Sequence, residues 1–249
     1  MASLCAPKFK KYSLELGGKN PNIIVADCDF EKALETTIKS SFLNQGEICL
    51  CGSRVFIEKA LYEKFKNALI EKTKALKVGD PQDPKTFMGP LVSKQHFEKV
   101  KTALETAKAE GAKFLTGDEP LELTKEFQAG NFLRPVIIEG LDNNCKTNQE
   151  EIFGPVITLQ PFETEEEVIT KANQTEYGLS ATVWTSDLSR GHKLADKIEA
   201  GMVWVNTWLN RDLRTPFGGM KNSGVGREGG FEAMRFFSQT KNICVEYQS

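Results

Sequence analysis

Residues 21–57, PNIIVADCDFEKALETTIKSSFLNQGEICLCGSRVFI, are the stretch of sequence that predicts the fold. Residues 21–26 (PNIIVA) and 54–57 (RVFI) are short apolar runs of the length of a buried strand. Between them apolar residues recur every four positions, which is typical of one helix face, and Asp27 or Asp29 can cap the start of that helix. The stretch therefore predicts strand–helix–strand, the repeating unit of a parallel sheet.

The same alternation continues to the end of the chain. After each apolar run of strand length comes a segment with helical spacing, as in Leu61, Phe65 and Leu69. The further strands that we expect are residues 113–115, 136–138, 156–159, 181–184, 202–205 and 242–246. We expect an α/β fold with a doubly wound, largely parallel sheet, and a surface excursion at residues 121–128.

Composition narrows the classes of function. The chain has 249 residues, of which 40% are hydrophobic, and its 32 basic and 34 acidic residues give a formal net charge of -2. Such a balanced charge argues against a nucleic-acid or anionic membrane partner. The sequence has no apolar run of the roughly 20 residues that span a bilayer, and residues 1–11 lack the apolar core of a signal peptide. We expect a soluble, cytoplasmic protein.

The cysteines and histidines argue against a metal site. Cys49 and Cys51 are too close together for the usual C-x2-C pair, and the only histidines, His96 and His192, are far from them in sequence. Two histidines in lysine-rich helical stretches also leave little for a Ser-His-Asp triad. The scattered positions argue against a disulfide scaffold: Cys5, Cys28, Cys49, Cys51, Cys145 and Cys244.

Residues 44–51 (NQGEICLC) are the first candidate for chemistry. They place Cys49 just past a predicted helix, between Gly46 and Gly52. A cysteine in such a turn can meet a substrate while backbone N–H groups stabilise its thiolate. The alternative is a buried, inert cysteine.

Residues 14–21 (LELGGKNP) are the second candidate. Glu15 lies between two leucines at the end of an apolar run, an unusual place for a charge. Burial raises the pKa of a carboxylate and makes it a competent base near neutral pH. The alternative is an edge strand on which Glu15 faces water.

These two segments together resemble the signature motifs of the aldehyde dehydrogenase family. Cys49, not Cys51, matches the nucleophile of the family's cysteine motif (residues 42–51), and residues 14–21 match its glutamate motif. The resemblance extends from about Lys11 to Val245, and three further stretches agree in order and separation: 150–155 (EEIFGP), 203–206 (VWVN) and 216–224 (PFGGMKNSG).

The resemblance implies a role for each matching residue. Cys49 would attack an aldehyde, with its own backbone N–H supplying half of the oxyanion hole, and Glu15 would activate water to release the acid. Glu151 would hold the nicotinamide ribose of NAD or NADP, with NAD favoured, and Phe153 would lie beside the ring. The family's substrate is a small-molecule aldehyde, and we expect a homo-oligomer.

The resemblance also implies missing parts. We expect residues 1–20 to be a remnant of the cofactor-binding domain that carries the catalytic glutamate, residues 21–235 to be the catalytic domain, and residues 236–249 to be an oligomerisation strand. Because most of the cofactor-binding domain is absent from the sequence, we expect this chain alone to bind the cofactor poorly. The alternative is an inactive paralogue or fragment that keeps the fold for binding or assembly.

The loop at residues 206–217 (NTWLNRDLRTPF) bears on the substrate. It resembles the substrate-lining loop of the muconic semialdehyde branch of the family, whose substrates carry a carboxylate. A guanidinium binds a carboxylate with two parallel N–H donors, and we favour Arg211 for this contact. The alternative is surface charge, with Arg211 or Arg214 paired to Asp212.

Overall fold

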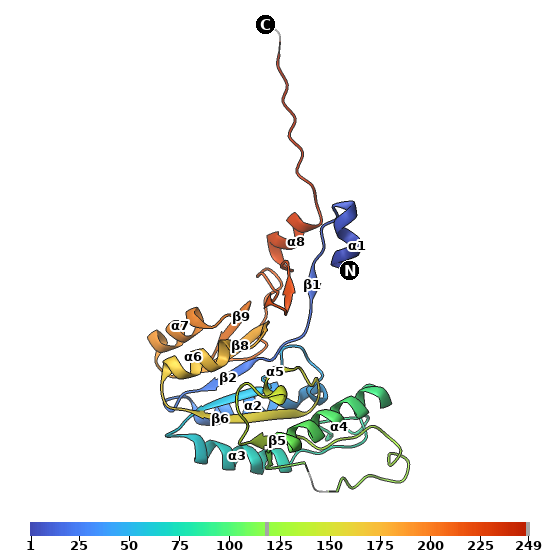
Figure 1. Ribbon diagram of the computed structural model, residues 1–249, viewed down its shortest axis with the longest axis vertical. Helices are drawn as coiled ribbons and strands as arrows, with labels where there is room; N and C mark the ends of the chain where they lie inside the picture. The colour runs from blue at the N-terminus through green and yellow to red at the C-terminus, as the bar shows by residue number, and fades with distance from the viewer. Residues whose placement is uncertain (118–119, 248–249) are drawn as a thin grey trace.

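A seven-stranded sheet forms the centre of the computed structural model, which describes residues 1–117 and 120–247 (Figure 1). Every neighbouring pair of strands in it is parallel except β4 with β5. The strands lie in the order β4 (Lys113–Phe114), β5 (Val136–Glu139), β6 (Val156–Phe162), β3 (Arg54–Glu58), β2 (Pro21–Ile24), β8 (Ser180–Trp184) and β9 (Met202–Val205). The prediction of a largely parallel α/β sheet is confirmed.

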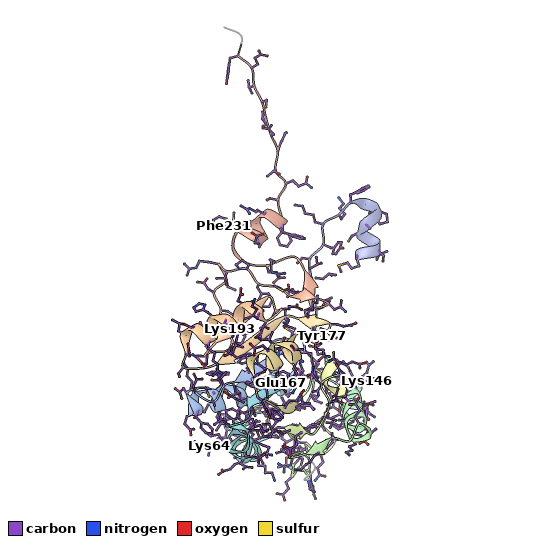
Figure 2. The ribbon with its side chains drawn as sticks, turned by 60° about the vertical axis from the view of Figure 1, so that its left-hand side comes forward. Lys64, Lys146, Glu167, Tyr177, Lys193 and Phe231 are labelled. Carbon is purple, nitrogen blue, oxygen red and sulfur yellow. The ribbon has the colours of Figure 1, made fainter. Side chains whose placement is uncertain are left out.

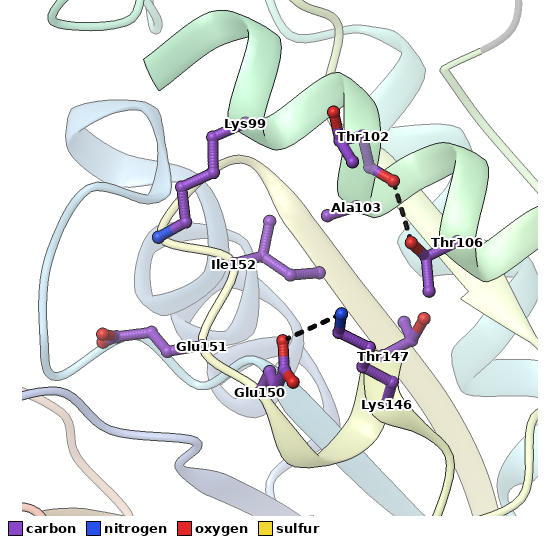
Figure 3. A pocket seen from close by; sticks show the side chains of 9 residues that line it. All are labelled: Lys99, Thr102, Ala103, Thr106, Lys146, Thr147, Glu150, Glu151 and Ile152. Carbon is purple, nitrogen blue, oxygen red and sulfur yellow. Dashed lines mark hydrogen bonds and ion pairs between the residues drawn. The ribbon is translucent and has the colours of Figure 1, made fainter. Parts of the chain in front are cut away.

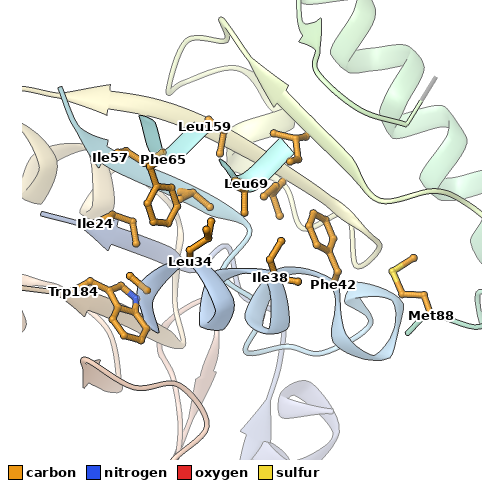
Figure 4. Packing of buried hydrophobic residues seen from close by; sticks show 14 of the residues in the cluster. Ile24, Leu34, Ile38, Phe42, Ile57, Phe65, Leu69, Met88, Leu159 and Trp184 are labelled. Atoms are coloured by element: carbon orange, nitrogen blue, oxygen red, sulfur yellow. The ribbon is translucent and has the colours of Figure 1, made fainter. Parts of the chain in front are cut away.

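Helices cover both faces of this sheet. Successive residues of each strand point to opposite faces, so apolar side chains on both faces pack against helices. On β2, Ile24 packs with α2 and α3, whereas Ile23 packs with α6 and α7. Figure 4 shows the first of these clusters, with Leu34 and Phe65 between the sheet and the two helices. The longer helices are α2 (Phe30–Phe42), α3 (Tyr62–Lys74), α4 (Lys94–Ala109), α6 (Glu165–Asn173) and α7 (Leu188–Lys197).

The start of α2 shows which aspartate caps the helix. The side chain of Asp29 accepts a hydrogen bond from Lys32 N at 3.2 Å, so Asp29 is the cap. Asp27 instead accepts from the Thr185 hydroxyl at 2.8 Å, beside β8. α2 therefore begins directly after Asp29, and its last residue, Phe42, is the first residue of the cysteine motif.

A buried arginine joins the sheet to α6. Arg54 on β3 is fully buried, and within the described residues its guanidinium donates to three backbone carbonyl oxygens. Two of them, Lys171 O and Ala172 O, belong to the last turn of α6, where helix carbonyls lack intrahelical partners. The third, Lys19 O at 2.9 Å, lies just before β2. Arg54 therefore fixes the glutamate motif to the body of the domain.

The glutamate motif pairs with a short strand near the C-terminus, and the two form one small antiparallel sheet. β1 (Leu14–Glu15) pairs with β11 (Gly224–Val225). Gly224 has a φ of +149°, and a Cβ there would lie only 2.1 Å from Leu14 O, so this position requires glycine. Pairing thus brings Glu15 beside residues that lie about 200 positions later in the chain.

Two expectations about the surface are corrected. Residues 242–246 form no strand within the chain; they extend away from the body after α8 (Gly230–Phe236), because a strand requires a hydrogen-bonded neighbour (Figure 1). Residues 121–128 are not simply a surface excursion, because Leu121, Leu123 and Phe127 pack against the main core. Among the described helices, none is both long and apolar enough to span a membrane.

Candidate active site

The cysteine motif forms a tight turn directly after α2. Residues Leu43–Gly46 form a 3-10 turn in which Asn44 and Gln45 have φ values of +51° and +60°. Gly46 follows with a φ of +70°, and a Cβ there would lie 2.3 Å from Gly154 O. The turn therefore reverses the chain and presses it against the backbone of the motif at residues 150–155.

The side chain of Asn20 holds the next part of this turn. Its Nδ2 donates to Cys49 O and Cys51 O, both at 2.8 Å, and its Oδ1 accepts from Ser180 N at 3.1 Å. Both amide hydrogens and the amide oxygen of this buried residue are thus used. The glutamate motif, which contains Asn20, sets the position of Cys49.

Apolar side chains surround Cys49. It packs in a cluster with Trp204, Trp208 and Phe217, and Trp208 Nε1 donates to Leu50 O at 3.0 Å. Burial, followed by the negative charge of Glu151, raises the pKa of the half-buried Cys49 thiol above its ordinary value.

Cys51 differs from Cys49 in its exposure. It is buried, and burial raises the pKa of its thiol to about 12. A thiol with such a pKa is almost entirely protonated near neutral pH, and little of the Cys51 surface is exposed. Of the two cysteines in the turn, Cys49 is therefore the better placed nucleophile.

Of the two alternatives for Glu15, the exposed edge strand is the one that the structure has, because Glu15 is exposed on β1. Even so, partial burial and the neighbouring carboxylate of Glu228 raise the pKa of Glu15 above its ordinary value. Arg227 and Arg211 oppose this shift. The charge of Glu15 in turn contributes to the raised pKa of Cys49, so the two side chains interact electrostatically.

Glu151 meets the backbone of the glutamate motif. Gly18 N donates to Glu151 Oε1 at 2.9 Å, and a Cβ at Gly17 would lie 2.2 Å from Oε2. The two glycines thus leave room for the carboxylate. Burial raises the pKa of Glu151 above its ordinary value.

Phe153 follows with a φ of +60°, which is uncommon for a residue with a side chain. Its carbonyl oxygen lies 2.6 Å from Nε2 of His96 on α4. The rings of His96 and Phe153 also meet edge to face, with their centroids 5.9 Å apart. Contacts with α4 therefore support this strained residue.

A cavity of about 360 Å³ adjoins Glu151, between α4 and residues 146–152 (Figure 3). Lys99 and Glu151 lie near each other at one end, and the charge of Lys99 opposes the raised pKa of Glu151. Lys146 and Glu150 form an ion pair at 3.7 Å on the other side. The volume falls within the range of small-ligand sites.

Arg211 and Arg214 differ in their partners. Arg214 pairs with Asp212, with Nε 2.9 Å from Oδ1, as the surface-charge alternative expects for one of the two. The Arg211 guanidinium instead lies over the Phe217 ring, 4.2 Å from its centroid. Arg211, Phe217 and Glu228 line a second cavity of about 290 Å³. The positive charge of Arg211 acts on both Glu15 and Cys49.

The structure adds three residues that the sequence alone does not single out as part of the site. Asn20 holds the Cys49 turn, His96 contacts Phe153 O, and Glu228 acts on Glu15. Only Asn20 could have been singled out from its neighbours in the sequence. Its amide directly precedes Pro21 and a buried strand, and a buried amide needs a hydrogen-bond partner. Among the described residues, no group of three or more His, Cys, Asp or Glu side chains could hold a metal ion.

The electrostatics of Cys49 predict how its alkylation depends on pH. Because its thiol pKa is raised, we expect the rate with iodoacetamide to keep rising above pH 9. Glu15→Gln removes a charge that raises this pKa, so alkylation at pH 8 should become roughly threefold faster; Arg211→Ala should make it slower by a similar factor. Tandem mass spectrometry separates Cys49 from Cys51. A slower rate for Glu15→Gln, or a faster rate for Arg211→Ala, would contradict this geometry.

Comparison with known proteins gives the class. The aldehyde dehydrogenase family, a family of oxidoreductases, matches residues 1–243. The chain belongs to the aldehyde dehydrogenase family.

Particular relatives are similar over nearly the whole chain. The chain is 51% identical to 2-aminomuconic semialdehyde dehydrogenase of Danio rerio over 97% of its own length and 50% of the relative's. It is 45% identical to 2-hydroxymuconic semialdehyde dehydrogenase of Pseudomonas putida, over 97% of the chain and 50% of that protein. The chain therefore spans about half the length of the curated relatives it matches.

A solved structure agrees with the fold. Betaine aldehyde dehydrogenase of Staphylococcus aureus, crystallised in complex with NAD+, superimposes with a TM-score of 0.88 at 38% identity, covering 92% of this chain and 45% of that one.

Proposed function

We propose that this chain is the catalytic part of an NAD-dependent aldehyde dehydrogenase that oxidises a carboxylate-bearing semialdehyde to the acid. The observation that carries the proposal is the convergence of three distant segments: Asn20 binds Cys49 O, and Gly18 N binds Glu151. The glutamate motif thus contacts both the candidate nucleophile, Cys49, and the candidate cofactor-binding residue, Glu151. The alternative is an inactive fold that is kept for binding or assembly.

Cys49 starts the reaction. Its thiolate adds to the aldehyde carbon and gives a thiohemiacetal, whose oxygen accepts the Cys49 N–H. The raised thiol pKa means that a base must take the proton, and Glu15 is the carboxylate whose own raised pKa suits that task. The surrounding cluster of Trp204, Trp208 and Phe217 excludes water from the adduct.

Glu151 and Phe153 fit a nicotinamide nucleoside. A carboxylate fixed by Gly18 N–H can accept hydrogen bonds from ribose hydroxyls, and the adjoining cavity gives the sugar room. Glu151 and Phe153 would hold the nicotinamide group, and it would supply the acceptor for the hydride of the thiohemiacetal carbon. NAD is favoured over NADP because the similar betaine aldehyde dehydrogenase was crystallised with NAD+.

Glu15 completes the cycle. It takes a proton from water as the water oxygen attacks the thioester carbon, and the carbon–sulfur bond breaks to release the acid and the Cys49 thiolate. Its exposed place on β1 gives it access to water. Partial burial and the carboxylate of Glu228 keep the pKa of Glu15 raised, which makes it a stronger base.

The purified chain tests this assignment. We expect slow hydrolysis of p-nitrophenyl acetate through an acetyl group on Cys49, and no NADH formation from a semialdehyde, because two contacts cannot offset the several kcal/mol needed to immobilise a dinucleotide. Acyl transfer needs no hydride acceptor. Mass spectrometry locates the acetyl group, and absorbance follows NADH. No acetylation at Cys49 would support the inactive alternative; strong NADH production would contradict the expected poor cofactor binding.

Arg211 is proposed to bind the substrate carboxylate. An aldehyde protects Cys49 from iodoacetamide by forming the thiohemiacetal, so the concentration for half protection measures binding. Arg211→Ala should raise this concentration about tenfold for adipic semialdehyde and leave hexanal nearly unchanged. Arg214→Ala, whose guanidinium is paired with Asp212, is the matched control and should change neither. Equal losses for both aldehydes would make Arg211 a structural residue.

Three further proposals concern organisation. We propose that residues 1–20, 21–235 and 236–249 are a cofactor-domain remnant, the catalytic domain and an oligomerisation strand of a homo-oligomer. Exposed Ile243, Val245 and Tyr247 on an unpaired extended segment support the last of these, and so does exposed Phe231 on the neighbouring α8 (Figure 2). Six free cysteines support a reducing, cytoplasmic location.

A further inference from the structure

His96 lies between two segments of the candidate site, the loop at residues 150–155 and the Cys49 turn. It is in the first turn of α4, where the Ser93 hydroxyl accepts from His96 N at 3.1 Å and fixes its backbone. Its side chain is largely buried. Nothing in the proposed reaction uses this imidazole, although it is within reach of both loops.

The imidazole Nε2 contacts an acceptor on each loop. It lies 2.6 Å from Phe153 O and 3.4 Å from Oε1 of Glu47, a buried carboxylate two residues before Cys49. Glu47 Oε1 also accepts from Val92 N at 3.1 Å, just before α4. Because a carbonyl and a carboxylate can only accept, Nε2 must carry the ring proton.

The same two loops also touch through their backbones. Gly46 approaches Gly154 so closely that a Cβ would lie 2.3 Å from Gly154 O. The glycine contact limits how near the loops come, but it provides no attraction between them. Phe153 has a φ of +60°, which is unfavourable by itself, so an attractive contact such as a hydrogen bond is needed to stabilise it.

We propose that His96 is a positioning residue whose Nε2–H, shared between Phe153 O and Glu47, fixes the Glu151–Phe153 segment relative to the Cys49 turn. The inference rests on the proposed function in one respect: it makes this bond the element that sets the nicotinamide side of the site against the nucleophile. The bond itself depends on no cofactor.

The first test needs no substitution. His96 and His192 are the only histidines in the sequence, and His192 is exposed on α7, so nitrogen NMR of the two rings at pH 8 is readily assigned. We expect His96 in the Nε2–H form with a slowly exchanging ring proton, and His192 with a rapidly exchanging one. A proton on Nδ1 of His96, or rapid exchange at its Nε2, would overturn the proposal.

The second test compares His96→Leu, which removes the donor, with His96→Gln, whose amide can keep an N–H for the same acceptors. Hydrogen exchange should become about tenfold faster in residues 44–51 and 151–154 of the leucine variant, and stay within about twofold in the glutamine variant. Lys101→Ala, on the solvent face of the same helix and paired with Glu98, is the control and should change neither segment.

Rescue by glutamine is the decisive outcome. A merely structural role would speed exchange throughout the domain and lower the melting temperature in both His96 variants alike. Unchanged exchange in either loop of His96→Leu, or no rescue by His96→Gln, would overturn the proposal. Since neither measurement uses cofactor or aldehyde, a failure of the proposed aldehyde oxidation would leave these results unaffected and is distinguishable from them.

Discussion

Replacing Cys49 by alanine should lower p-nitrophenyl acetate hydrolysis by the chain at least about 1,000-fold, whereas Cys51→Ala should retain most of it. Both variants remove one thiol from the same turn, so they are matched. The difference is expected because Cys51 is buried with a thiol pKa of about 12, whereas Cys49 is half-buried beside Trp208 and Phe217. Initial rates at pH 8 give the ratio.

Melting curves of the two cysteine variants serve as the control for this comparison. Cys51 belongs to the buried core, so Cys51→Ala should be the less stable of the pair while keeping the activity. If Cys51→Ala lost hydrolysis but kept the melting curve of the unsubstituted chain, Cys51 and not Cys49 would be the nucleophile.

Arg54→Ala should lower the free energy of unfolding by about 4 kcal/mol. The substitution empties a fully buried volume and leaves three carbonyl oxygens, on Lys19, Lys171 and Ala172, without their donor. Urea unfolding followed by circular dichroism measures the change. Arg54→Lys should recover only part of it, since an ammonium cannot reproduce the planar arrangement of guanidinium donors.

Arg235→Ala is the control for Arg54. That arginine is exposed on α8, 3.7 Å from Glu232, and its loss should cost less than about 0.5 kcal/mol. A small effect of Arg54→Ala, comparable with that of Arg235→Ala, would mean that the end of α6 and the glutamate motif do not depend on this contact.

Most of the fold could be predicted from the sequence because strands buried on both faces leave continuous apolar runs, such as those of β2 and β3. Residues 242–246 have the composition of a strand, yet strand formation depends on a neighbour that the sequence does not specify. Leu121, Leu123 and Phe127 were equally ambiguous, because an irregular segment has no periodicity to reveal which side chains reach the core.

The candidate site could be predicted only in part. Cys49, Glu15, Glu151 and Phe153 lie in short contiguous motifs, and those segments do converge. The surroundings of Glu15 were not predictable, because they come from β11 and Glu228, far along the chain. The place of His96 in the site could not be predicted for the same reason, because Phe153 and Glu47, which it contacts, belong to two other segments.

The amide of Asn20 has a further property that concerns the lifetime of the protein. Asparagine side chains deamidate when the backbone nitrogen of the following residue attacks the amide carbon, and the residue after Asn20 is Pro21, whose nitrogen carries no hydrogen. Asn20 is also buried, with its donors and its acceptor occupied. The group that holds the nucleophile's turn is therefore protected from the slow chemical ageing that converts exposed asparagines to aspartates, so the turn should keep its shape in old molecules as in new ones.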